Sequence, residues 1–130
     1  MTHRFDLRVY YEDTDLAGIV YYANYLKFIE RARTEFVRSL GIDQVALREK
    51  SNGFVFAVRR VEADYIAPAK FDDELSVLTA TEVVTGARLT LRQGIKRGDQ
   101  ELFVAVVTLV ALTDTGQPTR LPADIRLLLQ

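Results

Sequence analysis

Cysteine is absent from this chain of 130 residues, and histidine occurs once, at His3. The lack of cysteine excludes disulfides, thiolate nucleophiles, iron–sulfur clusters and zinc sites with cysteine ligands. A hydrolytic triad would have to use His3, which stands in a terminal segment of the kind that tends to fray. If the chain is an enzyme, we therefore expect its acid–base groups to be carboxylates, and we expect no metal site.

Long apolar runs and an excess of one charge are also lacking. No run approaches the roughly 20 apolar residues of a membrane span, and residues 1–6 lack the apolar stretch of a secretory signal. Seventeen basic and eighteen acidic side chains give a formal charge of −1, so no global field favours nucleic acid or an anionic membrane. We expect a cytoplasmic protein with no membrane span and no nucleic acid partner, and any anion site to be local.

Glycine and proline are scarce, at seven and three, and 48% of the residues are hydrophobic, which is typical of a packed globular chain. A chain of this length is long enough for one core and too short for two ordinary domains. It contains no internal repeat, linker or low-complexity stretch. The sequence predicts a single domain over residues 1–130.

The main helix is predicted to begin at Asn24, a good N-cap residue, and to end before Gly41. Apolar side chains recur between them at spacings of three and four, as in an amphipathic helix: Tyr25, Phe28, Ile29, Ala32, Phe36 and Leu40. A helix with so broad an aromatic face is expected to lie against a sheet.

Strands are predicted on both sides of this helix from alternation and β-branched residues. Val83 is expected to share one face of its strand with Leu75, Val77, Thr79 and Thr81, and the last strand is expected to be covered on both faces. A short helical turn is predicted over residues 45–50, and turns are predicted at residues 51–53, at Gly86 and at residues 97–100. The expected strands are 5–11, 54–66, 75–83, 87–96 and 102–112. One strand, a helix and then four strands indicate an α+β fold with an antiparallel sheet.

The densest polar cluster beside a helix start is the segment 11–18, YEDTDLAG. It brings the carboxylate of Asp15 near backbone N–H groups that have no intrahelical partner, and such groups can hold the oxygen of a polarised carbonyl. This arrangement fits an acyl-transfer site. On spacing alone, a purely structural role for Asp15 in the turn stays open, as it does for Glu12 and Asp13.

Residues 11–35, YEDTDLAGIVYYANYLKFIERARTE, closely resemble the signature of hotdog-fold acyl-CoA thioesterases. The nearest match is the branch associated with the Tol-Pal system, which is related to 4-hydroxybenzoyl-CoA thioesterases. The resemblance implies a hotdog fold, in which a long antiparallel sheet of about five strands wraps around one long central helix. It also implies hydrolysis of a small or medium acyl-CoA, with no cofactor apart from the CoA of the substrate.

The resemblance places the catalytic carboxylate at Asp15, acting as general base toward water or as a nucleophile that forms a mixed anhydride. The backbone N–H of Tyr22 falls where the family polarises the thioester carbonyl, and Gly18 falls on the glycine of the motif. The Tol-Pal branch usually carries His at the position of Tyr22, whereas the hydroxybenzoyl branch tolerates Tyr. A phenol with a pKa of about 10 is a poor base at neutral pH, so this departure bears on the substrate more than on the reaction.

Aromatic side chains near this site are candidates for an acyl pocket. Tyr21 and Tyr25 are nearest to it, whereas Phe28 and Phe36 are assigned to the core.

The nucleotide of CoA is expected at a turn: Thr85, Gly86 and Arg88 match the turn where related thioesterases hold it. The other candidates for binding phosphate are as well explained by a solvated face; these are Arg59, Arg60, Arg92 and Lys96.

A homo-oligomer is expected, because a curled sheet leaves an exposed edge and the site is expected to need a second copy. A dimer is the minimum, and a tetramer is common among relatives. Two other functions stay open. One is a non-catalytic module that binds acyl-CoA or acyl carrier protein, or an envelope-associated scaffold; the other is a hotdog dehydratase, which generally uses a His that this chain lacks outside His3.

Overall fold

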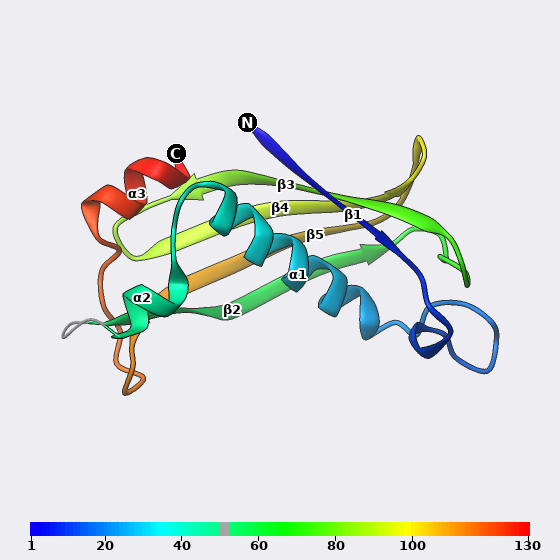
Figure 1. Ribbon diagram of the computed structural model, residues 1–130, viewed down its shortest axis with the longest axis horizontal. Coiled ribbons are helices and arrows are strands. Elements are labelled where there is room, and N and C mark those ends of the chain that lie inside the picture. The colour runs from blue at the N-terminus through cyan, green and yellow to red at the C-terminus, as the bar shows by residue number, and fades with distance from the viewer. Residues whose placement is uncertain (50–52) are drawn as a thin grey trace.

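In a computed structural model, which describes residues 1–49 and 53–130, five antiparallel strands form one sheet and a long helix lies against it (Figure 1). The sheet order is β1-β3-β4-β5-β2. The elements in chain order are β1 (Thr2–Arg8), the 3₁₀ turn η1 (Tyr11–Asp13), α1 (Asn24–Ser39), α2 (Gln44–Glu49), β2 (Phe54–Tyr65), β3 (Glu74–Val84), β4 (Arg88–Arg97), β5 (Gln100–Thr113) and α3 (Ala123–Leu129). The α+β arrangement predicted from the sequence is therefore confirmed.

The predicted helical turn over residues 45–50 is confirmed as α2, apart from Lys50, which lies outside the described residues together with most of the turn predicted at 51–53. In the described part of the chain, no helix is long and apolar enough to cross a membrane. The single domain over residues 1–130 stays a prediction.

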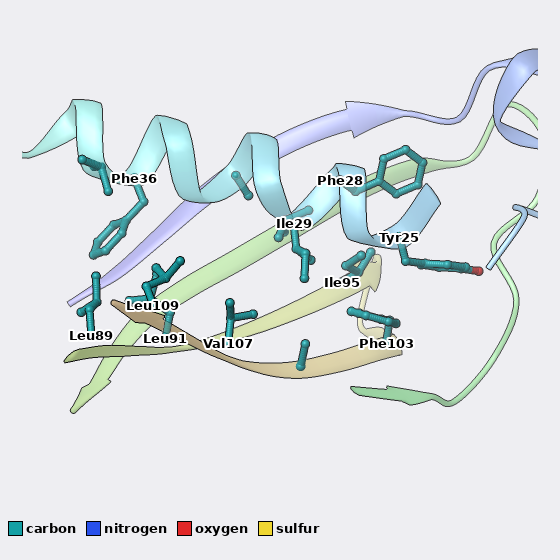
Figure 2. Close-up of a cluster of buried hydrophobic side chains, with 14 of the residues drawn as sticks. Tyr25, Phe28, Ile29, Phe36, Leu89, Leu91, Ile95, Phe103, Val107 and Leu109 are labelled. Carbon is teal, nitrogen blue, oxygen red and sulfur yellow. The ribbon is translucent and has the colours of Figure 1, made fainter. Parts of the chain in front are cut away.

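The aromatic face of α1 is buried against the sheet, as its spacing predicts. Figure 2 shows Tyr25, Ile29 and Phe36 facing side chains of β4 and β5, while the buried Phe28 lies next to Tyr25, with ring centroids 6.1 Å apart. Burial of each such side chain stabilises the fold by about 1.5–3 kcal/mol. The sheet residues drawn opposite the helix are Leu89, Leu91, Ile95, Phe103, Val107 and Leu109. The helix ends as predicted, because Gly41 has a φ of 83°.

The start of α1 corrects the prediction that Asn24 is its N-cap. The N-cap is Ala23, and Asn24 is the first helical residue. Its side-chain Nδ2 donates a hydrogen bond to the carbonyl of Asp13 at 2.9 Å. Asn24 therefore ties the helix to the preceding loop, because its amide is used as a donor outside the helix.

The first strand is shifted from its predicted range of 5–11. β1 pairs with β3 from Thr2 to Arg8. The carboxylate of Asp13 then accepts a hydrogen bond from the N–H of Tyr10 at 2.8 Å, which turns the chain into η1 and leaves Tyr11 82% exposed. A local bond from a side chain to the backbone thus replaces the strand ladder at this end.

The expected face of Val83 is wrong. The register of β3 on β4 shifts between Thr81 and Val83, and such a bulge changes the face to which later side chains point. Val83 is therefore 49% exposed, while Val84 packs against the core. On β5 the outward-facing Val104 and Val106 are half-buried in a single chain, and the expected cover of this strand on both faces stays a prediction.

Candidate active site

The segment between β1 and α1 folds back on itself as a tight loop. The Tyr21 N–H donates to the carbonyl of Asp13 and the Asp15 N–H donates to that of Ile19, each at 2.9 Å, so two arms of the loop lie side by side. Gly18 closes the turn with a bond from its N–H to the Asp15 carbonyl at 3.0 Å. Its φ of 81° is readily adopted only by glycine, which explains the sharp bend predicted at this position.

The carboxylate of Asp15 lies exposed on one arm of this loop. Its Oδ1 accepts a hydrogen bond from the N–H of Ala17 at 2.9 Å, which restricts the orientation of the side chain. The other oxygen has no hydrogen-bond partner among the residues that the structure describes. An oriented carboxylate with one unused oxygen is suited to act as a base or as a nucleophile.

The backbone amide of Tyr22 follows the second arm. The carbonyl of Tyr21 accepts a hydrogen bond from the N–H of Asn24 at 2.8 Å. In a trans peptide this carbonyl and the N–H of Tyr22 point in opposite directions, so the bond turns the Tyr22 N–H away from the helix. Within residues 1–49 and 53–130 this N–H has no acceptor, and it is therefore available to a carbonyl oxygen.

Tyr65, which the sequence analysis missed, closes the site from the end of β2. Its hydroxyl donates to the carbonyl of Tyr22 at 3.0 Å. Its ring lies edge-on to Tyr25 and to Phe103, with centroid distances of 5.3 and 5.0 Å. Burial raises the pKa of Tyr65, with smaller contributions from the neighbouring hydroxyls of Tyr22 and Tyr25. The hydroxyl therefore keeps its proton, and can donate, throughout the neutral range.

The two aromatic candidates for the acyl pocket differ in exposure. Tyr25 is only 3% exposed, its ring stacks on Phe103, and its hydroxyl oxygen accepts a bond from the N–H of Ala69 at 3.0 Å. Tyr25 thus packs in the core, and its burial does not favour the predicted substrate contact. Tyr21 is 46% exposed and its ring lies 4.9 Å from that of Tyr22, so this pair offers aromatic surface beside the loop.

The predicted nucleotide-binding turn, with Thr85, Gly86 and Arg88, joins β3 to β4. The Oγ1 of Thr85 accepts hydrogen bonds from the N–H groups of Ala87 and Arg88 at 3.2 and 3.0 Å. Figure 1 shows this turn at the opposite end of α1 from the loop between β1 and α1. The helix has 16 residues, which corresponds to about 24 Å. A single chain therefore separates the two parts of the site that the sequence predicts.

Arg120 adds a second cation to this turn, and no signal in the sequence places it there. The guanidinium of Arg120 lies directly over Gly86, because a Cβ built on this glycine would collide with it. The next N–H, that of Leu121, donates to the carbonyl of Gly86 at 2.8 Å. Arg88, the first residue of β4, and Arg120 are both exposed, so two cationic residues belong to this turn.

A polar network is buried beneath α1. Gln93 is 0% exposed, and its Nε2 donates to the carbonyl of Ile29 and to Oγ1 of Thr79, each at 2.9 Å. Its Oε1 accepts a bond from Arg33 at 3.1 Å, and burial lowers the pKa of Arg33. The network joins the helix to β3 and β4.

Arg33 also borders a groove of about 350 Å³ between α1 and β2. The groove is lined by Leu26, Lys27, Ile29, Glu30, Arg33, Val58 and Val61.

The sequence profile of the Thioesterase superfamily matches residues 17–104, which is more than half of the chain. The chain belongs to the thioesterase superfamily. Its relatives include the acyl-CoA thioesterase YbgC of Haemophilus influenzae, which is 42% identical over 124 residues that cover 94% of this chain and 90% of that protein. The resemblance noted from residues 11–35 is thus confirmed over almost the whole chain.

Solved structures of thioesterases share the fold. The probable thioesterase from Bartonella henselae has a TM-score of 0.90 at 38% identity and covers 94% of this chain and 100% of that one. A mutant of 4-hydroxybenzoyl-CoA thioesterase complexed with 4-hydroxybenzoyl-CoA has a TM-score of 0.90 at 23% identity, with 99% of both chains covered. The predicted hotdog fold is confirmed.

Proposed function

We propose that this thioesterase hydrolyses a small or medium acyl-CoA to the free acid and CoA. The observation that carries the proposal is the loop between β1 and α1. There the oriented carboxylate of Asp15 and the N–H of Tyr22, which has no acceptor among the described residues, stand on two arms of one turn. The relative in Haemophilus influenzae, named as an acyl-CoA thioesterase, supports the same chemistry.

In the proposed reaction the thioester oxygen accepts a hydrogen bond from the N–H of Tyr22. Negative charge develops on this oxygen when the carbonyl carbon is attacked, and one preorganised donor typically contributes about 10²–10³-fold to the rate. Asp15 either removes a proton from the attacking water or attacks the carbon itself, forming a mixed anhydride that water then opens. Both routes release the thiol of CoA and the free acid, and we propose that neither needs a metal or another cofactor.

We further propose that the working unit contains at least two copies of the chain. In the described residues, β2 pairs only with β5, so one of its edges is open. Val58 and Val61, beside this edge, are 48% and 38% exposed, and a second copy would cover them. In such a dimer, the turn with Arg88 from one chain would serve the loop with Asp15 from the other. A tetramer and a cytoplasmic location stay predictions.

The alternative function is a module of the same fold that binds acyl-CoA or acyl carrier protein without turnover. Thiol release from a panel of short, medium and aromatic acyl-CoAs separates the two functions. Hydrolysis of at least one member at a rate that saturates with substrate is the expected result. Binding of several acyl-CoAs with no thiol release from any of them would favour the non-catalytic module.

A further inference from the structure

We propose that Tyr65 is a positioning residue for this hydrolysis, whose hydroxyl holds the carbonyl of Tyr22 and thereby keeps the Tyr22 N–H aimed at the thioester oxygen. The inference rests on the proposed function and extends it to β2, outside the segment 11–35. In this role Tyr65 orients the N–H of Tyr22 and does not itself contact the substrate.

Two hydrogen bonds hold the peptide groups on either side of the Tyr22 Cα. The carbonyl before it, that of Tyr21, accepts from the N–H of Asn24 at 2.8 Å, and the carbonyl after it accepts from the hydroxyl of Tyr65 at 3.0 Å. Because each residue has only two soft backbone torsions, fixing both flanking peptide planes fixes the conformation of Tyr22.

The peptide group between Tyr22 and Ala23 has, among the described residues, only the bond from Tyr65. Its N–H belongs to Ala23, and in the described part of the chain this N–H has no acceptor. Removing the hydroxyl of Tyr65 would therefore leave this peptide group without a hydrogen bond to another part of the fold. The direction of the Tyr22 N–H would then be less restricted.

Tyr65 is itself held firmly enough to act as an anchor. It ends β2 opposite Phe103 of β5, and its ring packs edge-on against the rings of Phe103 and Tyr25. These contacts involve the ring and would be made equally well by phenylalanine. Among the residues that the structure describes, the hydroxyl bonds only to Tyr22, so Tyr65→Phe separates the positioning role from packing.

A misaimed oxyanion donor lowers the rate more than it weakens substrate binding, because charge on the thioester oxygen is largest in the transition state. Full loss of such a donor typically lowers kcat by about 10²–10³-fold. A donor that is only partly misaligned should lower kcat by less. We expect kcat of Tyr65→Phe to fall by roughly 10- to 50-fold, with KM changed less than about twofold. If Tyr65 served packing alone, Tyr65→Phe would keep its ring contacts, and its kcat would stay equal to that of the wild type.

The test compares wild type, Tyr65→Phe and the matched control Tyr10→Phe, whose side chain is 63% exposed and, among the described residues, makes no hydrogen bond to Tyr22. Steady-state kinetics with the best acyl-CoA, thermal denaturation, and the backbone amide resonances of Tyr22 and Ala23 are measured for all three. The expected result is a lower kcat and shifted amide resonances in Tyr65→Phe alone, with a melting temperature lowered by no more than the few degrees that one lost hydrogen bond explains. A kcat equal to that of Tyr10→Phe, or a loss confined to KM, would overturn the positioning role.

Failure of the proposed function gives a different result. If wild type releases no thiol from any acyl-CoA, both the hydrolytic function and the role of Tyr65 are overturned. If wild type is active and Asp15→Asn is not, but Tyr65→Phe keeps full kcat, only the role of Tyr65 is rejected.

Discussion

The side-chain amide of Asn24 donates a hydrogen bond to the carbonyl of Asp13 at 2.9 Å and so links the first residue of α1 to the loop that carries Asp15. The same carbonyl accepts the N–H of Tyr21, while the carboxylate of Asp13 accepts the N–H of Tyr10. Asp13 therefore shapes the loop through both its backbone and its side chain, and the proposed reacting carboxylate, that of Asp15, depends on this loop for its position.

We expect Asn24→Ala to loosen this loop. Loss of the bond to Asp13 should lower the free energy of unfolding by about 0.5–1.5 kcal/mol. It should also lower kcat by roughly tenfold, because small displacements of a reacting group strongly affect rate. Urea denaturation and steady-state kinetics measure both effects, with the exposed Arg31→Ala on the same helix as control. A variant that loses stability but keeps the kcat of the control would show that the bond serves folding only.

Strongly periodic and local features could be predicted from the sequence. The face of α1 follows from apolar spacing over 16 residues, and the bend at Gly18 follows from the one residue that readily takes a φ of 81°. The end of β1 and the face of Val83 could not be predicted, because one depends on a hydrogen bond from Tyr10 to the Asp13 side chain and the other on a bulge. Neither leaves a periodic signal.

Pairs distant in sequence were also beyond prediction. Tyr65 lies 43 residues after Tyr22, and on its own reads as one aromatic residue in a strand. Arg120 reaches Gly86 only because the segment after β5 returns to the β3–β4 turn, where Leu121 bonds to Gly86. The local part of the candidate site could thus be inferred from residues 11–35, whereas its anchors come from tertiary contacts.

The buried network around Gln93 should contribute measurably to stability. Gln93→Leu removes the partners of Arg33 and Thr79, and leaving buried polar groups unsatisfied typically costs about 1–3 kcal/mol each. We expect a loss of at least about 2 kcal/mol in the free energy of unfolding from urea denaturation. Thr90→Val, on the other face of β4, is the control and should change it by less than about 0.5 kcal/mol. Equal effects of the two substitutions would contradict the importance of the network.

Arg120 is expected to assist Arg88 in binding the phosphates of CoA. Arg120→Gln should raise KM for an acyl-CoA by about two- to fivefold and leave kcat unchanged. A change of this size corresponds to the free energy of one exposed ion pair. Because the charges are exposed, the effect should shrink as salt is added. The same acyl group on pantetheine, which lacks the nucleotide, should show no change in KM. An equal rise in KM for both substrates would mean that Arg120 does not contact the nucleotide.

The most direct test of the account is thiol release by wild type, Asp15→Asn and the control Glu12→Gln across the acyl-CoA panel. Asparagine keeps an oxygen that can accept the N–H of Ala17, so folding and oligomer size should be preserved. We expect kcat of Asp15→Asn to fall by at least about 100-fold, as for loss of a general base, while Glu12→Gln stays near wild type. Near-wild-type turnover by a folded Asp15→Asn variant would contradict the central claim that this carboxylate carries the hydrolysis.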